Sequence, residues 1–336
     1  MSVRVGVLGA GGWGTALAML LAGNGHAVRL WEYNAEAAAR LARTRENPFL
    51  PGIPIPETVR VTADLQETVK DAEIILLTVP SHTVRSVAGL LAGLGLPDAL
   101  IVSGTKGIEN HTLKRVSQIL TEMIPDLPAG RIAALSGPSH AEEVARGIPT
   151  AVTAASTVSA ASRRVQEIFM NDRFRVYSSR DPVGVELGGA LKNVIAVAAG
   201  ISDGAGCGDN TKAALMTRGI VEITRLGTAM GAEAETFAGL SGIGDLIVTC
   251  TSRHSRNRFV GEEVGKGRPL NEVLDGMLMV AEGVRTTQSA LDLSKIHRVD
   301  MPITREVYHV LFERKPARRA IEDLMTREAK AEDRGV

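Results

Sequence analysis

The chain of 336 residues has few aromatic residues, only two cysteines and no net charge. Aromatic residues make up 3%, so the core must be built mainly from aliphatic side chains. Lysine plus arginine (38) equals aspartate plus glutamate (38), which excludes a protein that binds nucleic acid through its overall charge. Cys207 and Cys250 are too few for a disulfide framework, so a reducing, cytoplasmic location is expected.

Long uninterrupted hydrophobic runs are also missing. The longest apolar stretch, residues 183–201, contains Glu186, Lys192 and Asn193. A membrane-spanning helix rarely carries these side chains together, so we expect a buried helix and no membrane insertion. No grouping of His, Cys, Asp and Glu has the spacing of a metal site, so no metal is expected.

What the sequence does contain is an alternation of strand-like and helix-like segments over its first ~180 residues. Strands are predicted at 3–8, 27–31, 74–79, 99–103, 131–135, 150–153 and 174–177, and helices at 15–22, 35–44, 84–91 and 113–123. Apolar strands that alternate with helices predict a parallel sheet covered on both faces. Residues 47–56 (NPFLPGIPIP) contain four prolines and are expected to form an irregular loop.

After Pro182 the strand signal disappears. Helices are predicted at 183–201, 211–230, 258–266, 288–296, 305–312 and 317–326. The chain is therefore predicted to be an α/β protein with two domains. Residues 1–182 would form a Rossmann-type, doubly wound dinucleotide-binding domain, and residues 183–336 an all-α substrate and catalytic domain.

A glycine-rich motif follows the first predicted strand. Gly9, Gly11 and Gly14 fit the pattern G-x-G-x-x-G, and the motif opens a predicted helix at Gly12 and Trp13. In this context the glycines permit a tight turn, the approach of a pyrophosphate and close packing of helix on strand. The alternative is a glycine-rich turn that binds no nucleotide.

An acidic residue follows the second predicted strand. Glu32 lies near the offset of ~20 residues at which a carboxylate accepts hydrogen bonds from the ribose hydroxyls of NAD. It would repel the 2′-phosphate of NADP, which favours NAD over NADP. Alternatively, Glu32 is an exposed polar residue in a turn.

Further polar segments follow other predicted strands. Lys106 lies in SGTKG after the strand at 99–103, and LSGPSH after the strand at 131–135 adds hydroxyls. Ligands of open parallel sheets bind beyond the carboxyl ends of strands, which makes Lys106 a candidate site cation. The alternative is a lysine on a surface loop.

Two polar residues, Lys192 and Asn193, lie inside the apolar helix predicted at 183–201. A buried lysine is costly without a partner or a role, and burial lowers its pKa. Gly188 and Gly189 would lie one turn earlier and leave space beside the ammonium group for a ligand. Such a lysine could exchange a proton with an alcohol. Alternatively, it reaches the surface or pairs with Glu186.

A third segment combines glycines, a carboxylate and arginines. Asp245 follows three closely spaced glycines, and residues 251–258 (TSRHSRNR) precede a predicted helix. Three arginines with hydroxyls and helix-start N–H groups would bind a small anion such as a phosphate. The alternative is a solvated basic loop.

These motifs carry a resemblance that covers residues 3 to 312. They are GAGGWGTALA, TVPSH, SGTKG, LSGPSHAEEVA, ELGGALKNVIAVAAGISDG, LSGIGDLIVTCTSRHSRNR and VAEGVRT. Together they resemble the bacterial-type NAD(P)-dependent sn-glycerol-3-phosphate dehydrogenases. The resemblance implies a cytoplasmic enzyme that interconverts sn-glycerol 3-phosphate and dihydroxyacetone phosphate and supplies glycerophospholipid synthesis.

The resemblance also implies residue roles. Lys192 matches the proton acceptor, Lys106 matches a lysine that contacts cofactor and substrate, and Asp245 is inferred to lie near the reacting alcohol. Substrate-binding positions are matched by Gly137, Ser139, Asp245, Ser255, Arg256 and Asn257, with Lys106, Lys192 and Asn193 as further candidates. Cofactor-binding positions are matched by Trp13, Tyr33, Ala141, Arg256, Val280 and Glu282, in addition to Gly9, Gly11, Gly12, Gly14, Glu32 and Lys106.

Two other functions are also compatible with the sequence. The first is another dehydrogenase with a Rossmann domain and a helical domain, of the 3-hydroxyacyl-CoA or 6-phosphogluconate type. The second is a protein that senses NAD(H) without chemistry. The expected partner is a small phosphorylated three-carbon substrate, and a homodimer is compatible with the sequence.

Overall fold

The computed structural model describes residues 2–96, 98–277, 280–329 and 331–332. The chain divides into two compact units. The first contains residues 1–105 and 116–182, and the second contains residues 106–115 and 183–336. The division after Pro182 coincides with the predicted boundary, but residues 106–115 pack with the helical unit although the chain around them belongs to the first. Lys106 therefore belongs to the helical unit.

The first unit is built on one sheet of eight strands in the order β3-β2-β1-β4-β5-β6-β7-β8. The strands are Arg4–Leu8 (β1), Ala27–Trp31 (β2), Val59–Thr62 (β3), Ile74–Leu77 (β4), Leu100–Ser103 (β5), Ile132–Ser136 (β6), Thr150–Ala155 (β7) and Phe174–Ser179 (β8). The prediction of a wholly parallel sheet is wrong at one pair, because β7 runs antiparallel to β6. The switch leaves the Rossmann-type order intact from β3 to β6.

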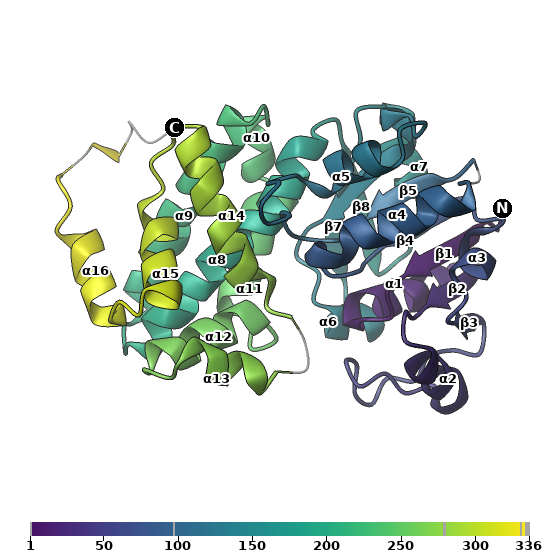
Figure 1. Ribbon diagram of the computed structural model, residues 1–336, viewed down its shortest axis with the longest axis horizontal. Helices are drawn as coiled ribbons and strands as arrows, with labels where there is room; N and C mark the ends of the chain where they lie inside the picture. Colours follow the sequence, from purple (N-terminus) through teal and green to yellow (C-terminus); the bar gives the residue numbers. More distant parts are fainter. Residues whose placement is uncertain (1, 97, 278–279, 330, 333–336) are drawn as a thin grey trace. The chain divides into compact units, whose positions relative to one another are not determined.

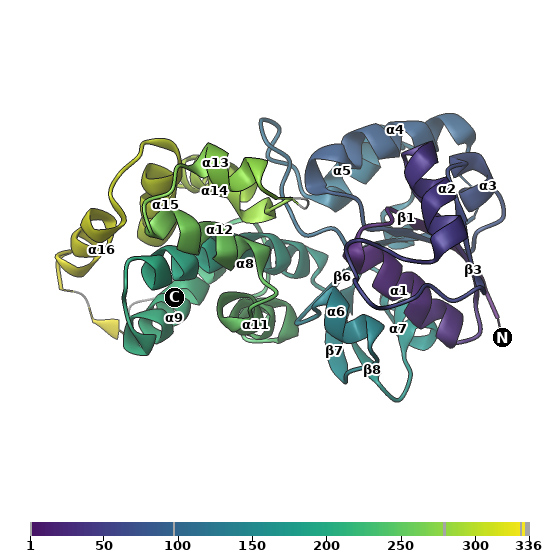
Figure 2. The same ribbon diagram turned by 90° about the horizontal axis from the view of Figure 1, so that it is seen from below.

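Helices cover both faces of this sheet (Figures 1 and 2). One face packs against α1 (Gly12–Gly23), α6 (Ala141–Ala145) and α7 (Ser159–Phe169), and the other against α4 (Val84–Leu94) and α5 (Val116–Met123). Each face has its own aliphatic core, with Leu17 and Phe169 in one and Leu91 and Ile119 in the other. Two-sided burial explains why the central strands read as continuous apolar runs.

Several short elements were not predicted. β3 has four residues and α3 (Leu65–Val69) has five, too few to show a period in the sequence. The helix α7 was missed because its segment carries two adjacent arginines and small polar residues. α2 (Ala35–Thr44) has the predicted bounds, since Asn34 caps its first turn through a bond from the Ala37 N–H.

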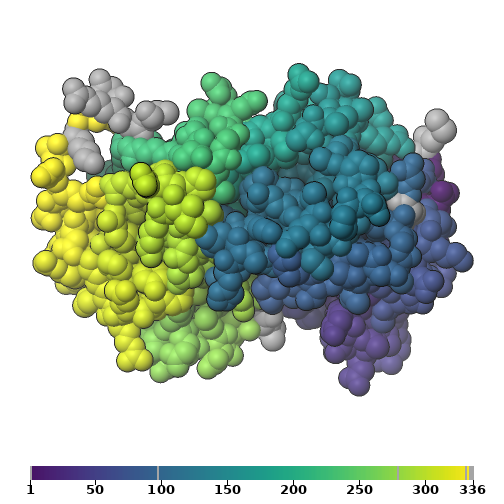
Figure 3. Space-filling view, turned by 45° about the horizontal axis from the view of Figure 1, so that its top comes forward, coloured from purple at the N-terminus to yellow at the C-terminus, as the bar shows by residue number. Residues whose placement is uncertain are grey.

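The second unit is all helical. Its longer helices are α8 (Pro182–Gly204), α9 (Asp209–Ala229), α12 (Arg256–Gly265), α14 (Glu282–Ile296), α15 (Pro302–Phe312) and α16 (Ala317–Met325). Shorter ones are α10 (Ala234–Phe237), α11 (Asp245–Thr251) and α13 (Leu270–Asp275), with a π-helical turn at Leu240–Gly244. In the space-filling view, the side chains of α15 and α16 form a yellow surface of this unit (Figure 3).

The helix α8 is the centre of the helical unit. Among the described residues it is the one helix long and apolar enough to cross a membrane, but its apolar window is fully buried inside the protein. Glycines let α12 approach it closely: a Cβ on Gly200 would lie 2.0 Å from the Arg258 carbonyl oxygen, and one on Gly261 2.1 Å from the Val197 carbonyl oxygen. The two backbones are therefore in direct contact.

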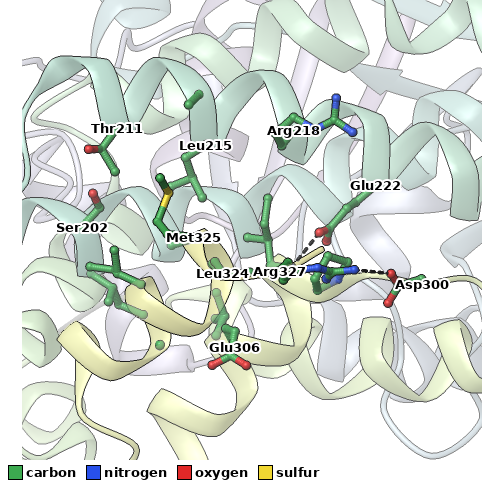
Figure 4. Close-up of a pocket in the computed structure, with 18 of the residues that line it drawn as sticks. Ser202, Thr211, Leu215, Arg218, Glu222, Asp300, Glu306, Leu324, Met325 and Arg327 are labelled. Atoms are coloured by element: carbon green, nitrogen blue, oxygen red, sulfur yellow. Dashed lines mark hydrogen bonds and ion pairs between the residues drawn. The ribbon is translucent and has the colours of Figure 1, made fainter. Parts of the chain in front are cut away.

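A buried carboxylate holds the start of α15. Glu222 on α9, labelled in Figure 4, accepts hydrogen bonds. The donors are the N–H groups of Ile303 (2.7 Å) and Thr304 (3.2 Å). These are N–H groups of the first helical turn, which have no partner inside the helix. Burial raises the pKa of Glu222 to about 7, although the hydrogen bonds from Ile303 and Thr304 oppose the shift.

Replacing Glu222 should therefore destabilise the helical unit. Glu222→Ala leaves two buried N–H groups without a partner and should cost ~1–3 kcal/mol in urea denaturation. Glu222→Gln keeps an acceptor and should cost less.

Because the folded-state pKa is raised from 4.5 to about 7, the stability due to Glu222 is lost as the pH rises through about 7. Glu222→Gln should not lose stability over this pH range, because glutamine does not titrate. If the free energy of unfolding depended on pH identically in wild type and Glu222→Gln, Glu222 would not be the titrating group.

Candidate functional site

The glycine motif forms a tight turn between β1 and α1. Gly9 has φ +109, a conformation that favours glycine, and its N–H bonds the Trp31 carbonyl oxygen at 3.1 Å. A Cβ on Gly14 would lie 2.0 Å from the Gly9 carbonyl oxygen, so only glycine allows α1 to start this close to β1. A Cβ on Gly11 would meet nothing within 4 Å, so space is open at this position. Gly9 and Gly14 thus have the steric surroundings that the motif predicts, and Gly11 leaves room for a ligand.

The start of α1 is suited to an anion. Its cap residue Gly11 provides no side-chain cap, and its first turn has no acidic residue. The N–H groups there and the positive end of the helix dipole are the features that hold phosphates in dinucleotide-binding proteins. The first unit therefore fits a dinucleotide at this turn.

The two predicted cofactor residues after β2 differ in exposure. Glu32 is half-buried and accepts a hydrogen bond from the Asn34 N–H at 3.1 Å, and Tyr33 is exposed with its ring against Trp31. The Arg29 guanidinium bonds the Asp71 carboxylate and the Glu67 carbonyl oxygen. Arg29 is thus engaged elsewhere and does not offset the negative charge of Glu32.

Four more predicted residues, Trp13, Gly137, Ser139 and Ala141, lie in the first unit. A Cβ on Gly104 would lie 2.9 Å from the Trp13 Nε1, so the Trp13 ring packs against the backbone of the SGTKG motif. Gly137 follows β6 with φ +149, and the Ser139 hydroxyl donates to its carbonyl oxygen at 2.8 Å. Ala141 begins α6, and its Cβ lies 3.5 Å from where a Gly12 Cβ would be.

The helical unit contains a buried cluster of charges. The Lys192 ammonium donates to the Asp245 carboxylate at 2.5 Å and to the Thr249 hydroxyl at 2.7 Å. Lys106, from the segment 106–115, donates to the other carboxylate oxygen at 2.8 Å. Lys192 and Asp245 are 6% and 1% exposed, so a carboxylate shared by two lysines lies out of water.

This environment shifts the pKa of both buried groups. Burial lowers the pKa of Lys192 from 10.5 to about 8; the Asp245 charge opposes the shift and the Lys106 charge adds to it. Burial alone would raise the pKa of Asp245, but Lys106 and Lys192 outweigh it and hold that pKa below its usual range. A lysine with a pKa near 8 can both accept and donate a proton near neutral pH.

Two details of the predicted lysine site differ from expectation. The space beside Gly188 is filled by the chain itself: a Cβ on Gly188 would lie 2.5 Å from the Ser241 carbonyl oxygen. The glycine therefore admits the turn Leu240–Gly244, which leads into Asp245, and not a ligand. The alternative pairing of Lys192 with Glu186 is wrong, because Glu186 forms an ion pair with Arg115.

Thr249 was not identified from the sequence. It lies one helical turn after Asp245 on α11, and its hydroxyl donates to the Asp245 carbonyl oxygen at 2.6 Å. The spacing of four residues from Asp245 was the available signal, but α11 is too short to be predicted from its pattern.

Two asparagines extend the cluster toward α14. The Asn193 side-chain oxygen Oδ1 accepts from the Asn257 side-chain Nδ2 at 2.8 Å, and the Asn257 Oδ1 accepts from the Gly283 backbone N–H at 2.9 Å. The Arg256 guanidinium donates to the Val280 carbonyl oxygen at 3.0 Å, just before Glu282 begins α14. These predicted residues are therefore neighbours in the structure.

The arginine segment does not act as one anion site. Arg258 bonds the Asp203 carboxylate through Nε (2.8 Å) and a terminal nitrogen (2.7 Å), so it forms an ion pair inside the helical unit. Ser255 caps α12 by accepting from the Arg258 N–H at 3.2 Å. The expectation of three arginines around one anion is wrong for Arg258, whereas the exposed Arg256 lies beside Asn257.

A cavity of about 670 Å³ lies elsewhere in the helical unit, between α8, α9, α15 and α16 (Figure 4). Its lining does not include Lys106, Lys192 or Asp245. Charged groups at its edge pair with one another, as Arg327 does with Asp300 at 2.7 Å. Among the described residues, no group of three or more His, Cys, Asp or Glu side chains could hold a metal ion.

Comparisons with known proteins agree over both units. Residues 4–162 match the model of the NAD-dependent glycerol-3-phosphate dehydrogenase N-terminus, and residues 181–322 match that of its C-terminus. The chain is 52% identical over 331 residues to the NAD(P)+ glycerol-3-phosphate dehydrogenase of Chlorobium phaeobacteroides (strain BS1), covering 98% of this chain and 99% of that one. It is 54% identical over 333 residues to the protein of the same name from Geobacter sp. (strain M21), covering 99% of both.

Solved structures show the same relation. The crystal structure of glycerol-3-phosphate dehydrogenase from Coxiella burnetii matches with a TM-score of 0.93 and 38% identity, covering 97% of this chain and 99% of that one.

Gly14, which is crowded, and Gly11, which faces open space, allow the turn to be tested by substitution. Gly14→Ala should lower the melting temperature, because its Cβ has no room beside the Gly9 carbonyl oxygen. Gly11→Ala should leave the melting temperature unchanged and weaken NADH binding ~10-fold or more, because its Cβ projects into the open space at the start of α1. Gly23→Ala, at the other end of α1 and also in open space, is the control that should change neither. Unchanged NADH binding by Gly11→Ala would show that the pyrophosphate lies elsewhere.

Proposed function

Because the chain belongs to the family of NAD(P)-dependent glycerol-3-phosphate dehydrogenases, we propose that it interconverts sn-glycerol 3-phosphate and dihydroxyacetone phosphate with NAD(P). The observation that carries this proposal is the buried ammonium of Lys192, held between Asp245 and Thr249. A protein that only sensed NAD(H) would have no use for a buried lysine whose pKa lies near 8.

The chain's own contribution to the chemistry is proton transfer and its control. A bound nicotinamide ring would supply the hydride acceptor for C2 of glycerol 3-phosphate, or the hydride donor for the ketone. In the oxidation, Lys192 Nζ takes the proton of the C2 hydroxyl as the C–H electron pair leaves as hydride, and in the reduction it gives the proton back. Asp245 and Thr249 fix the position of Nζ, and Lys106 limits how strongly Asp245 stabilises the charged form of Lys192.

The phosphate of the substrate is assigned to the start of α12. Arg256 is exposed, always charged and able to donate a planar pair of N–H groups to a phosphate. Asn257 donates one amide hydrogen to Asn193, which leaves the other N–H of the same group for an anion. Gly137 and Ser139 are assigned to substrate binding, and Val280, Glu282 and Ala141 to the cofactor, by their match to the family's positions.

Cofactor choice is assigned to the segment after β2. Glu32 is half-buried at the end of β2, and Arg29 is occupied by Asp71. A 2′-phosphate would meet a carboxylate without a compensating arginine from β2. NAD(H) is therefore used at least as well as NADP(H). The enzyme acts in the cytoplasm, where it supplies glycerophospholipid synthesis, and a homodimer is its proposed assembly.

Removing the proton-transfer group should stop turnover but not cofactor binding. Lys192→Met fills a similar volume without an ionisable group, so kcat should fall by at least ~100-fold in dihydroxyacetone phosphate reduction. NADH binding, followed by fluorescence titration, should change little. Near-normal turnover in this variant would overturn the role of Lys192.

The two directions of the reaction should depend on pH in opposite ways. The oxidation needs neutral Lys192, so its kcat/KM should rise as the pH increases through about 8. The reduction needs protonated Lys192, so its kcat/KM should fall over the same range. Profiles that move in the same direction in both reactions would exclude Lys192 as the titrating group.

Glu32 should control the choice between the two cofactors. Glu32→Ser removes the carboxylate and should raise the ratio of kcat/KM for NADPH to that for NADH by ~10-fold. The measurement compares both cofactors with wild type and variant. A wild type that strongly prefers NADPH would mean that Glu32 does not face the ribose.

A further inference from the structure

The irregular loop at residues 47–56 contains a buried side chain that contacts the glycine turn. Asn47 is 2% exposed, and Leu50 and Ile55 of the same loop are also buried. The loop closes on itself at its start, because the Asn47 side-chain oxygen accepts from the Phe49 N–H (2.9 Å) and its backbone oxygen accepts from the Leu50 N–H (2.9 Å). The two oxygens of Asn47 are therefore bound within its own loop, which fixes the position of its side chain.

The amide nitrogen of Asn47 links the two sides of the glycine turn. It donates to the Ala10 carbonyl oxygen at 3.0 Å and to the Thr15 hydroxyl at 2.7 Å. Ala10 lies between the first two glycines of the motif, and Thr15 is fully buried in the first turn of α1. Both hydrogens of the Asn47 amide are thus used on this turn.

These bonds determine the direction of the next N–H group. In a trans peptide the carbonyl oxygen and the following N–H point in opposite directions. Since the Ala10 oxygen points to Asn47, the Gly11 N–H points away from the loop. Glycines on both sides of Ala10 would otherwise let this peptide rotate at little cost.

The loop also limits the space above the turn. The Phe49 carbonyl oxygen lies 3.3 Å from where a Gly12 Cβ would be. Asn47 fixes the turn from one side, and the backbone at Phe49 closes over Gly12.

We propose that Asn47 is a positioning residue for the pyrophosphate-binding turn: it holds the Ala10–Gly11 peptide with its N–H directed to the cofactor, and so sets the affinity for NAD(H) without touching it. This inference rests on the proposed binding of the dinucleotide at Gly9–Gly14. It assigns to the proline-rich loop a function in cofactor binding.

The test separates cofactor affinity from turnover and from stability. Asn47→Ala removes both donated bonds without adding charge, so KM for NADH in dihydroxyacetone phosphate reduction should rise ~10-fold or more. At saturating NADH, kcat and KM for dihydroxyacetone phosphate should stay within about two-fold of wild type. The dissociation constant of ADP-ribose, which carries the pyrophosphate without nicotinamide, should rise by the same factor as that of NADH.

A matched control tests whether loss of any such asparagine has this effect. Asn171 also accepts backbone N–H bonds, from Arg173 and Phe174, and donates its amide to another residue, Asn24 (2.7 Å), in the same unit. Asn171→Ala should leave KM for NADH unchanged. If Asn47→Ala does not fold, Thr15→Val removes the hydroxyl that Asn47 bonds at nearly constant shape, and should raise KM for NADH by a smaller factor, ~3-fold.

The outcomes distinguish this inference from the proposed function. Wild-type protein that binds no NADH would overturn both. Wild type that binds NADH, with unchanged KM for NADH in Asn47→Ala or in Thr15→Val, would overturn the role of Asn47 alone. A fall in kcat at saturating NADH without a rise in KM for NADH or in the ADP-ribose dissociation constant would also overturn it.

Discussion

The buried contact between Lys192 and Asp245 is a strong constraint on the helical unit. Placing an ammonium and a carboxylate out of water costs several kcal/mol for each ion, and only close pairing with further hydrogen bonds offsets that cost. The second lysine, the Thr249 hydroxyl and the close approach of the turn Leu240–Gly244 to Gly188 provide this compensation. The same surroundings leave Lys192 with a pKa near 8, so the arrangement that makes burial tolerable also makes the lysine chemically useful.

Close backbone contacts at glycine recur in both units. In the first unit, Gly14 allows α1 to begin against β1, and in the second, Gly200 and Gly261 allow α8 and α12 to touch. The approach of α12 to α8 has a consequence for the site, because it places Asn257 within hydrogen-bonding distance of Asn193. A sequence with many glycines and few aromatic residues suits such packing, in which backbone contacts replace large side chains.

Local signals were enough to predict the glycine turn of the first unit. Its strand, glycine spacing and helix are contiguous in the chain, and the roles of Gly9, Gly11 and Gly14 depend on steric rules that act within a few residues. The start of α2 was also predictable, since Asn34 supplies an N-cap of ordinary type. Short elements such as β3 and α3 were missed because four or five residues show no period. The strand β7 was predicted, but its antiparallel direction was not, because strand direction leaves no mark on composition.

The sequence by itself determined the α/β-to-helical change at Pro182, the dinucleotide turn and the candidate residues Lys192, Lys106 and Asp245. Tertiary structure decided which of the candidates are partners. Asp245 and not Glu186 neutralises Lys192, and Arg258 pairs with the Asp203 carboxylate and not with a bound ligand. The segment 106–115, which contains Lys106, packs with the helical unit although the chain on both sides of it belongs to the first unit. Asn47 contacts the glycine turn across more than thirty intervening residues. The physical reason is that charges and amides at distant positions compete for the same partners, and only the packing of helices and loops determines which of them come within hydrogen-bonding distance.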